Sequence, residues 1–496
     1  MNATNLHLFV LVVPLLSALA INLLGRRSRQ WIAPMVLGSL AFSVFGSIII
    51  MARVIEHGNL SYTVGNWRPP YGIELVVDPL SALMMVLISV VALLASFSSL
   101  KSVEQELPGR EHFFFTLYMI LIAGLFGLVL TGDAFNLYVL LEITSITTYG
   151  LIAMGRGRAA LSSFNYIIMG SIGACFYLLG IGYIYILTGT LNMADIARIL
   201  PTLNAPVATA TAIAFALVGL WVKMAFFPLH SWLPNAYSQA PTGAGTMVAP
   251  LMTKVTVYLM VRVILSMYTP AMVFTHEWIA QGVVWASALA IICGSVLALG
   301  QKDLRRMLTY IIVAEVGYMV GGIFLANANG LTGSILHIVN DALMTLCLFL
   351  VVAAIIYRQG SVSLVSLQGI FRRMPITMAA FTLGAFAMIG VPPTCGFFSK
   401  WYLILGGIDG GHWEFVIALV ASSLINAVLF FRIIELAYFG SLQEGDHHEH
   451  LSTERHEAPW WMLSPLVLTA VLLIVVGLST GPLINNVIRL MIPVGF

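Results

Sequence analysis

The sequence predicts an all-α, polytopic membrane protein, and its composition, its hydropathy pattern and the placement of its basic residues support this class. Hydrophobic residues make up 59% of the 496 residues, and charged residues make up only 9%. Soluble globular proteins carry about 25% charged residues. A water-soluble fold of this length could not bury so much apolar surface, so the lipid bilayer is the expected solvent. The formal net charge of +2 does not indicate a nucleic-acid-binding protein.

About fourteen apolar segments are long enough to cross a bilayer, which requires about 20 mostly apolar residues. They cover residues 6–25, 32–52, 79–100, 113–131, 135–155, 162–188, 206–228, 243–268, 278–299, 304–326, 331–357, 375–392 continuing through 396–409, 413–439, and 460–488.

The basic residues test this helix count, because cytoplasmic loops of membrane proteins are enriched in lysine and arginine. With the N-terminus outside, fourteen basic residues fall in inward-facing loops and four fall in outward-facing loops. An overlooked helix near the middle of the chain would disturb this division. We therefore expect a multi-pass protein of the cell (inner) membrane with both termini on the outer, periplasmic side.

Charged side chains inside the expected helices are informative, because each costs about 2.5–3.5 kcal/mol on insertion scales and those retained usually serve transport. Seven polar side chains belong to this class: Glu142, Lys223, Lys254, Glu315, His337, Asp341 and Lys400. His337 and Asp341 are four residues apart, so they can touch on one helical face. Arg262, near an outer helix end, is expected to extend to the membrane interface. The alternative for Glu142 and Lys223 is a purely structural role.

Two of the expected helices contain proline-rich interruptions, one in each half of the chain. The prolines are Pro228 and Pro234 in the first half, and Pro392 and Pro393 in the second. Membrane helices tolerate such breaks where the backbone lines a cavity, and paired breaks indicate inverted-repeat transporters. His230 follows Lys223 by seven residues, so both could share one helical face. A helix-end histidine with satisfied hydrogen bonds is the alternative for His230.

Five sequence strings are jointly specific. They are GDAFNLYVLLE (132–142), VKMAFFPLHSWLPNAY (222–237), APTG (240–243), QKDLRRMLTY (301–310) and GVPPTCGFFSKW (390–401). Through these strings the chain resembles the antiporter-like subunits of Mrp antiporters, respiratory complex I and group 4 membrane-bound hydrogenases. The similarity covers most of the chain.

This resemblance implies two inverted five-helix repeats at residues 113–268 and 269–440, each with a broken helix, flanked by segments 1–112 and 441–496. The family's functional positions correspond to Glu142, Lys223, His230, Lys254, His337 and Lys400. Lys400 and the chain length favour the branch of the D-type Mrp subunits. Together with Glu315 and Asp341, these functional positions form the expected proton and cation relay. Asp341 and Glu315 depart from the common family pattern, so the centre of this relay is expected to be more acidic here.

The function that the resemblance implies is proton and cation translocation within a multisubunit Na⁺ or K⁺/H⁺ antiporter. Other membrane subunits are the expected partners, and no cofactor, metal or catalytic residue is expected in this chain. The alternative is a proton-pumping subunit of a complex I-like NADH:quinone oxidoreductase or of a hydrogenase or formate-oxidising complex. A haem enzyme and an independent solute carrier fit the residues less well.

A polar stretch at residues 444–457 contains four histidines among several acidic residues. A metal-binding or pH-sensing role is one interpretation, but histidine-rich composition is only a weak indication of such sites. A solvated loop between two helices is the favoured interpretation.

Overall fold

The computed structural model describes residues 5–439 and 456–493. Within these ranges thirteen helices are long and apolar enough to cross a membrane. The first six are α1 (Leu6–Leu24), α2 (Ile32–His57), α3 (Pro79–Glu106), α4 (Glu111–Leu130), α5 (Ala134–Ala153) and α6 (Ala159–Thr188). The other seven are α8 (Pro206–Lys223), α10 (Thr242–Arg262), α12 (Glu277–Leu299), α13 (Leu304–Phe324), α14 (Ala328–Gln359), α18 (Trp413–Phe439) and α19 (Trp460–Leu478). The predicted polytopic helical class is confirmed.

Shorter elements connect or extend these helices. The short α-helices are α7 (Met193–Ile199), α9 (Trp232–Gln239), α11 (Pro270–Val273), α15 (Ile370–Arg373), α16 (Pro375–Ile389), α17 (Cys395–Asp409) and α20 (Thr480–Asn486). The two strands are β1 (Leu60–Thr63) and β2 (Glu74–Val77). The remaining turns are 3₁₀ segments η2 (Arg29–Trp31), η3 (Val64–Asn66), η4 (Leu200–Thr202) and η6 (Ile488–Met491), and a π-helical segment η5 (Val263–Tyr268).

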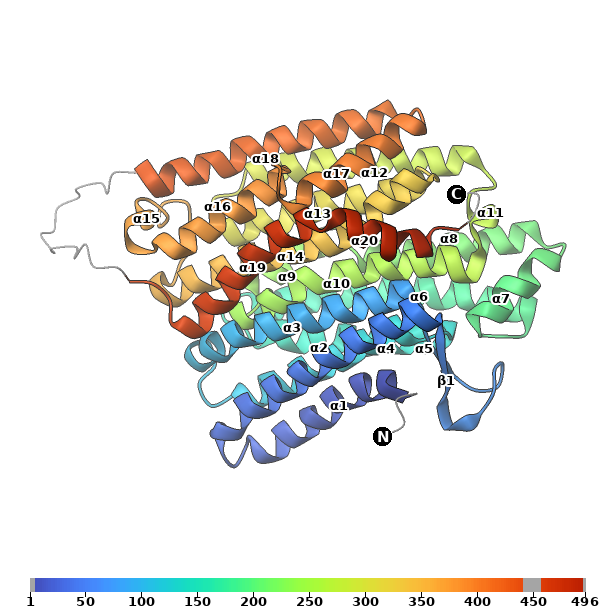
Figure 1. Cartoon of the computed structure of the whole chain (residues 1–496), viewed down its shortest axis with the longest axis horizontal. Coiled ribbons are helices and arrows are strands. Elements are labelled where there is room, and N and C mark those ends of the chain that lie inside the picture. Colours follow the sequence, from blue (N-terminus) through green and yellow to red (C-terminus); the bar gives the residue numbers. More distant parts are fainter. Residues whose placement is uncertain (1–4, 440–455, 494–496) are drawn as a thin grey trace, which may run out of the picture.

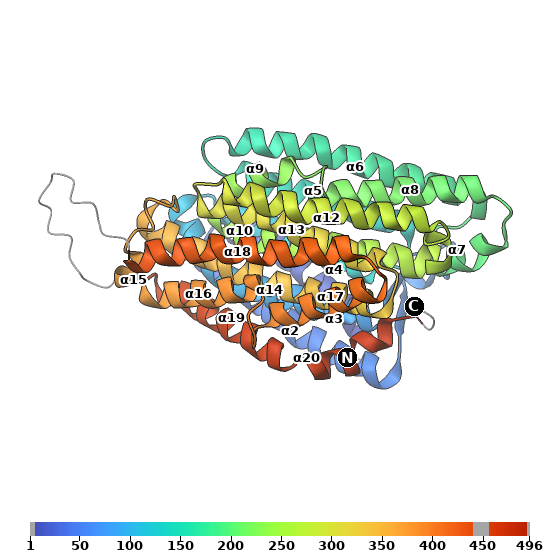
Figure 2. The ribbon, with the colours of Figure 1, turned by 90° about the horizontal axis from the view of Figure 1, so that it is seen from above.

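The long helices run side by side along the longest axis of the molecule (Figure 1). Figure 2 shows α10, α13 and α14 in the middle of the bundle, between α6 and α8 on one side and α19 and α20 on the other. In the apolar stretch of each helix that could cross a membrane, 94% of the residues are buried in α10 and in α13, and all are buried in α14. The corresponding share in α1 is 28%. Lys254, Glu315 and Asp341, which lie on these three helices, are therefore enclosed by protein instead of facing lipid.

One end of the bundle, called here the hairpin end, carries the antiparallel strands β1 and β2, in which Leu60 lies opposite Val77. The opposite end carries α15 (Figure 1). Asp78 follows β2 directly and caps α3, because its carboxylate accepts the backbone N–H of Ser81 at 2.9 Å. The start of α1 and the end of α20 lie toward the hairpin end (Figure 1). Which side of the membrane this end faces stays a prediction.

The seventh expected helix is broken earlier than its sequence suggested. α8 ends at Lys223, and α9 begins only at Trp232. Pro228 lies in the break, whereas Pro234 lies in the first turn of α9, where the N–H that proline lacks has no partner to lose. The indole Nε1–H of Trp232 donates to the carbonyl of Val222 at 3.1 Å. This bond ties the start of α9 to the end of α8, although the Val222 carbonyl also accepts from the backbone N–H of Ala225 at 3.2 Å.

The second break separates α16 from α17, and it falls where the sequence predicted it. α16 ends at Ile389 and α17 begins at Cys395, with Pro392 and Pro393 between them. Gly390 adopts φ +94°, a left-handed conformation that favours glycine. Each helix is 15 residues long, so neither half spans a bilayer alone. Together they correspond to the twelfth expected segment, which adds one crossing to the thirteen long helices of the described residues.

We expect Gly396→Ala to destabilise the second broken helix. A methyl group at Gly396 would lie 1.9 Å from the carbonyl oxygen of Ala387, so the backbone of α16 or α17 must move. Overpacking of this kind costs about 1–3 kcal/mol. The thermal unfolding midpoint of the purified protein in detergent measures the effect. Gly182→Ala is the matched control, since nothing lies within 4 Å of a methyl group there. Equal midpoints for both variants would contradict the close packing.

Candidate functional site

The first buried ion pair joins α5 to the broken end of α8. Lys223 Nζ lies 2.7 Å from Glu142 Oε1 and donates to Ser145 Oγ at 2.8 Å. Glu142 and Ser145 lie three residues apart, so they present oxygens on one face of α5. The Lys223 side chain is 4% exposed and that of Glu142 is 25% exposed. Glu142 is therefore the more accessible partner.

The second ion pair joins α10 to α14 in the fully enclosed centre. Lys254 Nζ lies 2.9 Å from Asp341 Oδ2, and both side chains are 0% exposed. Thr345, one turn along α14, donates its hydroxyl to Asp341 Oδ1 at 2.9 Å and accepts from Lys254 Nζ at 3.3 Å. Both charged residues were expected in the relay from sequence, but their pairing was not.

The third pair joins α14 to α13. His337 Nε2 lies 2.5 Å from Glu315 Oε2, and both side chains are 0% exposed. The other ring nitrogen, Nδ1, contacts Ser399 Oγ on α17 at 2.9 Å. The spacing in the sequence allowed contact between His337 and Asp341. The structure corrects this, because α13 supplies the partner of His337 and α10 supplies the partner of Asp341.

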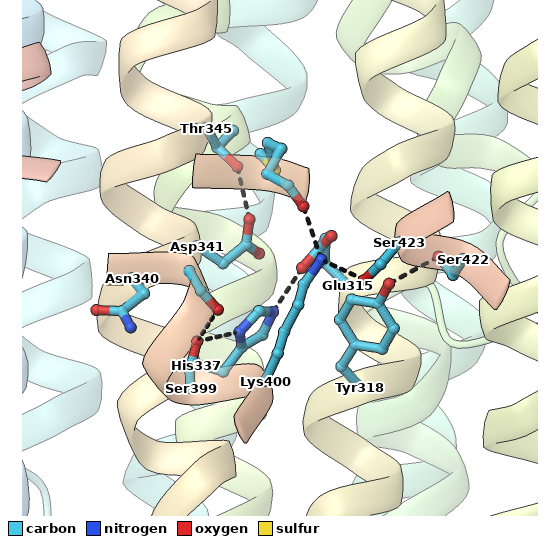
Figure 3. A network of polar contacts seen from close by, with 12 residues as sticks. Glu315, Tyr318, His337, Asn340, Asp341, Thr345, Ser399, Lys400, Ser422 and Ser423 are labelled. Atoms are coloured by element: carbon cyan, nitrogen blue, oxygen red, sulfur yellow. Dashed lines mark hydrogen bonds and ion pairs between the residues drawn. The ribbon is translucent and has the colours of Figure 1, made fainter. Parts of the chain in front are cut away.

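Lys400 on α17 lies beside this third pair, as Figure 3 shows. Its ammonium donates to the carbonyl of Met388 at 2.6 Å and to Ser423 Oγ at 3.3 Å, and it lies 5.1 Å from the ring centroid of Tyr318. The break after α16 leaves the Met388 carbonyl available, and the C-terminal end of a helix attracts cations. Among the described residues no carboxylate pairs directly with Lys400, although Glu315 acts on it through space.

His230 does not join the same arrangement. The expectation that it shares a helical face with Lys223 is wrong, because α8 ends at Lys223 and the chain is not helical again until α9. The imidazole stacks on the ring of Phe227 at 5.1 Å and lies edge-on to Tyr310 at 6.4 Å. His230 thus lies in the break between α8 and α9, whereas Lys223 is the last residue of α8.

Arg262 is another correction to the sequence-based expectation. Its guanidinium does not extend to the interface; the residue is 9% exposed and forms a two-pronged ion pair with Asp78. The acidic cap before α3 and an arginine eight residues after Lys254 were the only signals in the sequence. Neither indicates that α3 and α10 bring the two groups together.

The sequence did not indicate several uncharged residues that surround the pairs. They are Ser145, Thr345, Ser399, Ser423 and Tyr318. Hydroxyl groups are common inside membrane helices, so the sequence alone does not distinguish those that contact a charge from those that bond their own helix.

Most of the histidine-rich stretch lies outside the described residues. A metal-binding or pH-sensing role for it therefore stays an interpretation of the sequence. Glu457, at its described edge, accepts from the backbone N–H of Ile376 at 2.6 Å and from the hydroxyl of Thr377 at 2.7 Å. A carboxylate at this position stabilises the N-terminal end of α16.

Stability alone does not account for the two fully enclosed pairs, Lys254–Asp341 and His337–Glu315. Burying two charges costs several kcal/mol per ion, and apolar residues of similar volume are often as stable or more stable. A chain that keeps lysine, histidine and carboxylate groups on its most enclosed helices therefore retains them for another purpose. Groups of this kind in membrane interiors mark ion and proton pathways.

Comparisons with known proteins show the family to which the chain is related. The family described as "NADH:quinone oxidoreductase/Mrp antiporter, TM" matches residues 131–426. The NADH-quinone oxidoreductase subunit N of Desulforudis audaxviator is 40% identical, over 99% of this chain and 99% of the relative. The D-type subunit of the Na(+)/H(+) antiporter of Alkalihalophilus pseudofirmus is 30% identical, over 89% of this chain and 88% of the relative.

A solved structure of the Mrp complex from Dietzia sp. DQ12-45-1b contains a chain that superposes with a TM-score of 0.87 at 25% identity. The superposition covers 99% of this chain and 97% of that one. The fold, the matched segment and the identities lead to one conclusion: the chain belongs to the NADH:quinone oxidoreductase/Mrp antiporter family of transmembrane proteins.

Proposed function

We propose that this chain is the proton- and cation-translocating membrane subunit of a multisubunit Na⁺ or K⁺/H⁺ antiporter. Its proposed partners are the other membrane subunits of that antiporter, and its proposed location is the cell membrane. The proposed relay consists of Glu142, Lys223, Lys254, Asp341, His337, Glu315 and Lys400. His230 lies at the first helix break and is proposed as a neighbour of this series.

The observation that carries the proposal is the succession of charged groups across the middle of the bundle. Glu142 and Lys223 link α5 to α8, and α8 packs against α10. Lys254 on α10 pairs with α14, and α14 in turn pairs with α13 through His337. Lys400 follows on α17, which packs against α14. Each step thus passes between helices that are in contact.

Such a succession can transfer charge because neighbouring groups sense one another. Coulomb interactions are large in a low-dielectric interior, so a change in one group alters the proton affinity of the next. A proton that reaches Glu142 removes the attraction that holds Lys223. Lys223 is then able to turn to another acceptor, and the change passes to the next pair. Water is required to carry protons between pairs that do not touch.

The proposal includes an orientation and an internal symmetry. The hairpin end is placed outside, because the basic residues concentrate in the loops of the opposite end. Residues 113–268 and 269–440 are proposed as inverted repeats, since each contains one broken helix.

The test is cation-dependent loss of a pH gradient in inverted membrane vesicles that contain this chain with all its partner subunits. Addition of Na⁺ or K⁺ is expected to dissipate the gradient, and vesicles without the complex should hold it. A gradient that is insensitive to both cations in vesicles with the assembled complex would contradict antiport.

A redox-driven proton pump is the second candidate, and the relative that favours it is the 40% identical NADH-quinone oxidoreductase subunit N. The same buried pairs would serve, with electron transfer in partner subunits as the driving force. In the same vesicles, this candidate requires that NADH, formate or another electron donor builds the pH gradient. A gradient that responds only to Na⁺ or K⁺ would exclude it.

A further inference from the structure

The Asp78–Arg262 ion pair is fixed by more hydrogen bonds than any ion pair of the relay. Arg262 Nη1 and Nη2 lie 2.5 and 2.8 Å from the two carboxylate oxygens of Asp78. Nη1 also donates to Ser266 Oγ at 3.2 Å, and Nε and Nη2 donate to the Tyr258 hydroxyl at 3.2 and 3.0 Å. Two-pronged arginine–carboxylate bonds restrict geometry as well as stabilise it. The guanidinium therefore has little freedom to move.

Arg262 lies on the same face of α10 as the central lysine. Lys254, Tyr258 and Arg262 follow one another at intervals of four residues, and this spacing aligns side chains along one side of a helix. Tyr258 is fully buried between the two cations, and its hydroxyl donates to the carbonyl of Val129 at 2.9 Å. This face runs from the position of Lys254 toward the hairpin end, although the ammonium of Lys254 itself is turned the other way and donates to the carbonyl of Ala249 at 3.3 Å.

A cavity whose lining includes several polar and charged side chains lies where this face ends. It has a volume of about 190 Å³, and its lining includes Asp78, Arg262 and Ser266, together with Glu74 and Asn192. Glu74 accepts from Asn192 Nδ2 at 3.2 Å, so a carboxylate of β2 is held at the cavity. Tyr258 and the Asp78–Arg262 pair thus lie between the central lysine and a space lined by acidic and polar groups.

An arginine in this place obstructs protons and cations. The guanidinium is not deprotonated in proteins, so it does not relay a proton as lysine, histidine or a carboxylate can. A fixed positive charge in a narrow passage also repels cations. Burial raises the pKa of Asp78, but the charge and hydrogen bonds of Arg262, with those of Ser81, hold that pKa below its ordinary value. The carboxylate therefore stays ionised and keeps the guanidinium in place.

We propose that Asp78, Arg262 and Tyr258 form an electrostatic plug that closes a direct path from Lys254 to the hairpin-end cavity. With this path closed, charge that reaches Lys254 continues along the relay through His337 and Glu315 to Lys400. The inference rests on the proposed translocation function, because a plug is needed only beside a proton path. Removal of the plug should create a proton leak that requires no Na⁺ or K⁺.

The test uses proteoliposomes that contain the assembled complex, with choline as the sole added cation and thiocyanate as a permeant counter-ion. An imposed pH gradient is followed with a pH-sensitive dye. The double variant Arg262→Gln with Asp78→Asn removes the charge without leaving an unpaired carboxylate. We expect its gradient to decay at least roughly tenfold faster than that of the wild type. Arg262→Lys is the matched control, because it keeps the positive charge and should hold the gradient.

A further substitution locates the start of the leak. Addition of Lys254→Ala to the double variant should restore slow decay if the leak begins at Lys254. Tyr258→Phe removes one acceptor of the guanidinium and should leak by a smaller factor. It replaces the double variant in the test if the double variant does not assemble.

Decay at the wild-type rate in the assembled double variant would overturn the plug. If Tyr258→Phe is used in its place, decay at the wild-type rate in that variant would overturn the plug. A leak that persists with Lys254→Ala would overturn the path. Failure of the wild type to exchange cations would count against antiport and leave this comparison of leaks intact.

Discussion

Lys254→Ala is expected to abolish cation-driven proton exchange and to destabilise the protein at the same time. The substitution removes the ion-pair partner of Asp341, whose side chain is 0% exposed, and among the described residues leaves it the hydroxyl of Thr345. Removal of one member of a buried ion pair costs about 3–5 kcal/mol, because the remaining charge is uncompensated. Exchange in inverted vesicles and the thermal midpoint of the purified complex measure the two effects.

The double variant Lys254→Met with Asp341→Leu separates stability from transport. It removes both charges and fills the space with apolar atoms, so most of the lost stability should return. Exchange should stay at the background level, since the central step of the relay is missing. Transport by the double variant would show that ions do not pass through this pair. A single variant as stable as the wild type would show that Asp341 is not left as an uncompensated charge.

Glu142→Gln is expected to lower exchange to the level of vesicles without the complex, with little change in assembly or thermal midpoint. Glutamine keeps an oxygen near Lys223, and Ser145 still accepts from the ammonium at its present distance of 2.8 Å. The variant nevertheless has no group at position 142 that takes up and releases a proton. Glu142 is 25% exposed, so solvent also reduces the cost of leaving Lys223 without its counter-charge.

Glu104→Gln provides the comparison for Glu142. Glu104 pairs with Lys101 at 3.0 Å on a half-exposed surface, where such pairs contribute about 0–1 kcal/mol. Its loss should leave exchange unchanged. Wild-type exchange by Glu142→Gln, measured beside this control, would remove Glu142 from the relay.

The sequence was sufficient to predict the helices and most of the charged residues of the candidate site. Each crossing carries its own apolar run, so hydropathy identifies it without knowledge of its neighbours. Lys254 and Glu315 could be recognised because a charge within such a run is costly wherever the helix packs. The second helix break followed from Pro392 and Pro393, whose backbone chemistry is local as well.

The pairings could not be predicted, because they depend on which helices touch. Asp341 could face His337 along its own helix or Lys254 on another, and only the packing of α10 against α14 decides between them. Arg262 has a side chain long enough to reach the interface, but the cap of α3 places Asp78 within its reach. His230 was assigned by extending a helical period across a break, where that period no longer applies.

Lys400→Ala, assayed for cation-driven proton exchange in vesicles with verified assembly of the complex, tests the relay most directly. Lys400 donates to the carbonyl of Met388 and to Ser423, and no carboxylate pairs with it directly among the described residues. Its removal therefore leaves no directly paired carboxylate without its counter-charge, and any loss of exchange reports on transport itself. A relay that runs in series from Glu142 to Lys400 predicts exchange at the background level, as in Glu142→Gln. Exchange near the wild-type rate in the assembled Lys400→Ala complex would contradict that relay.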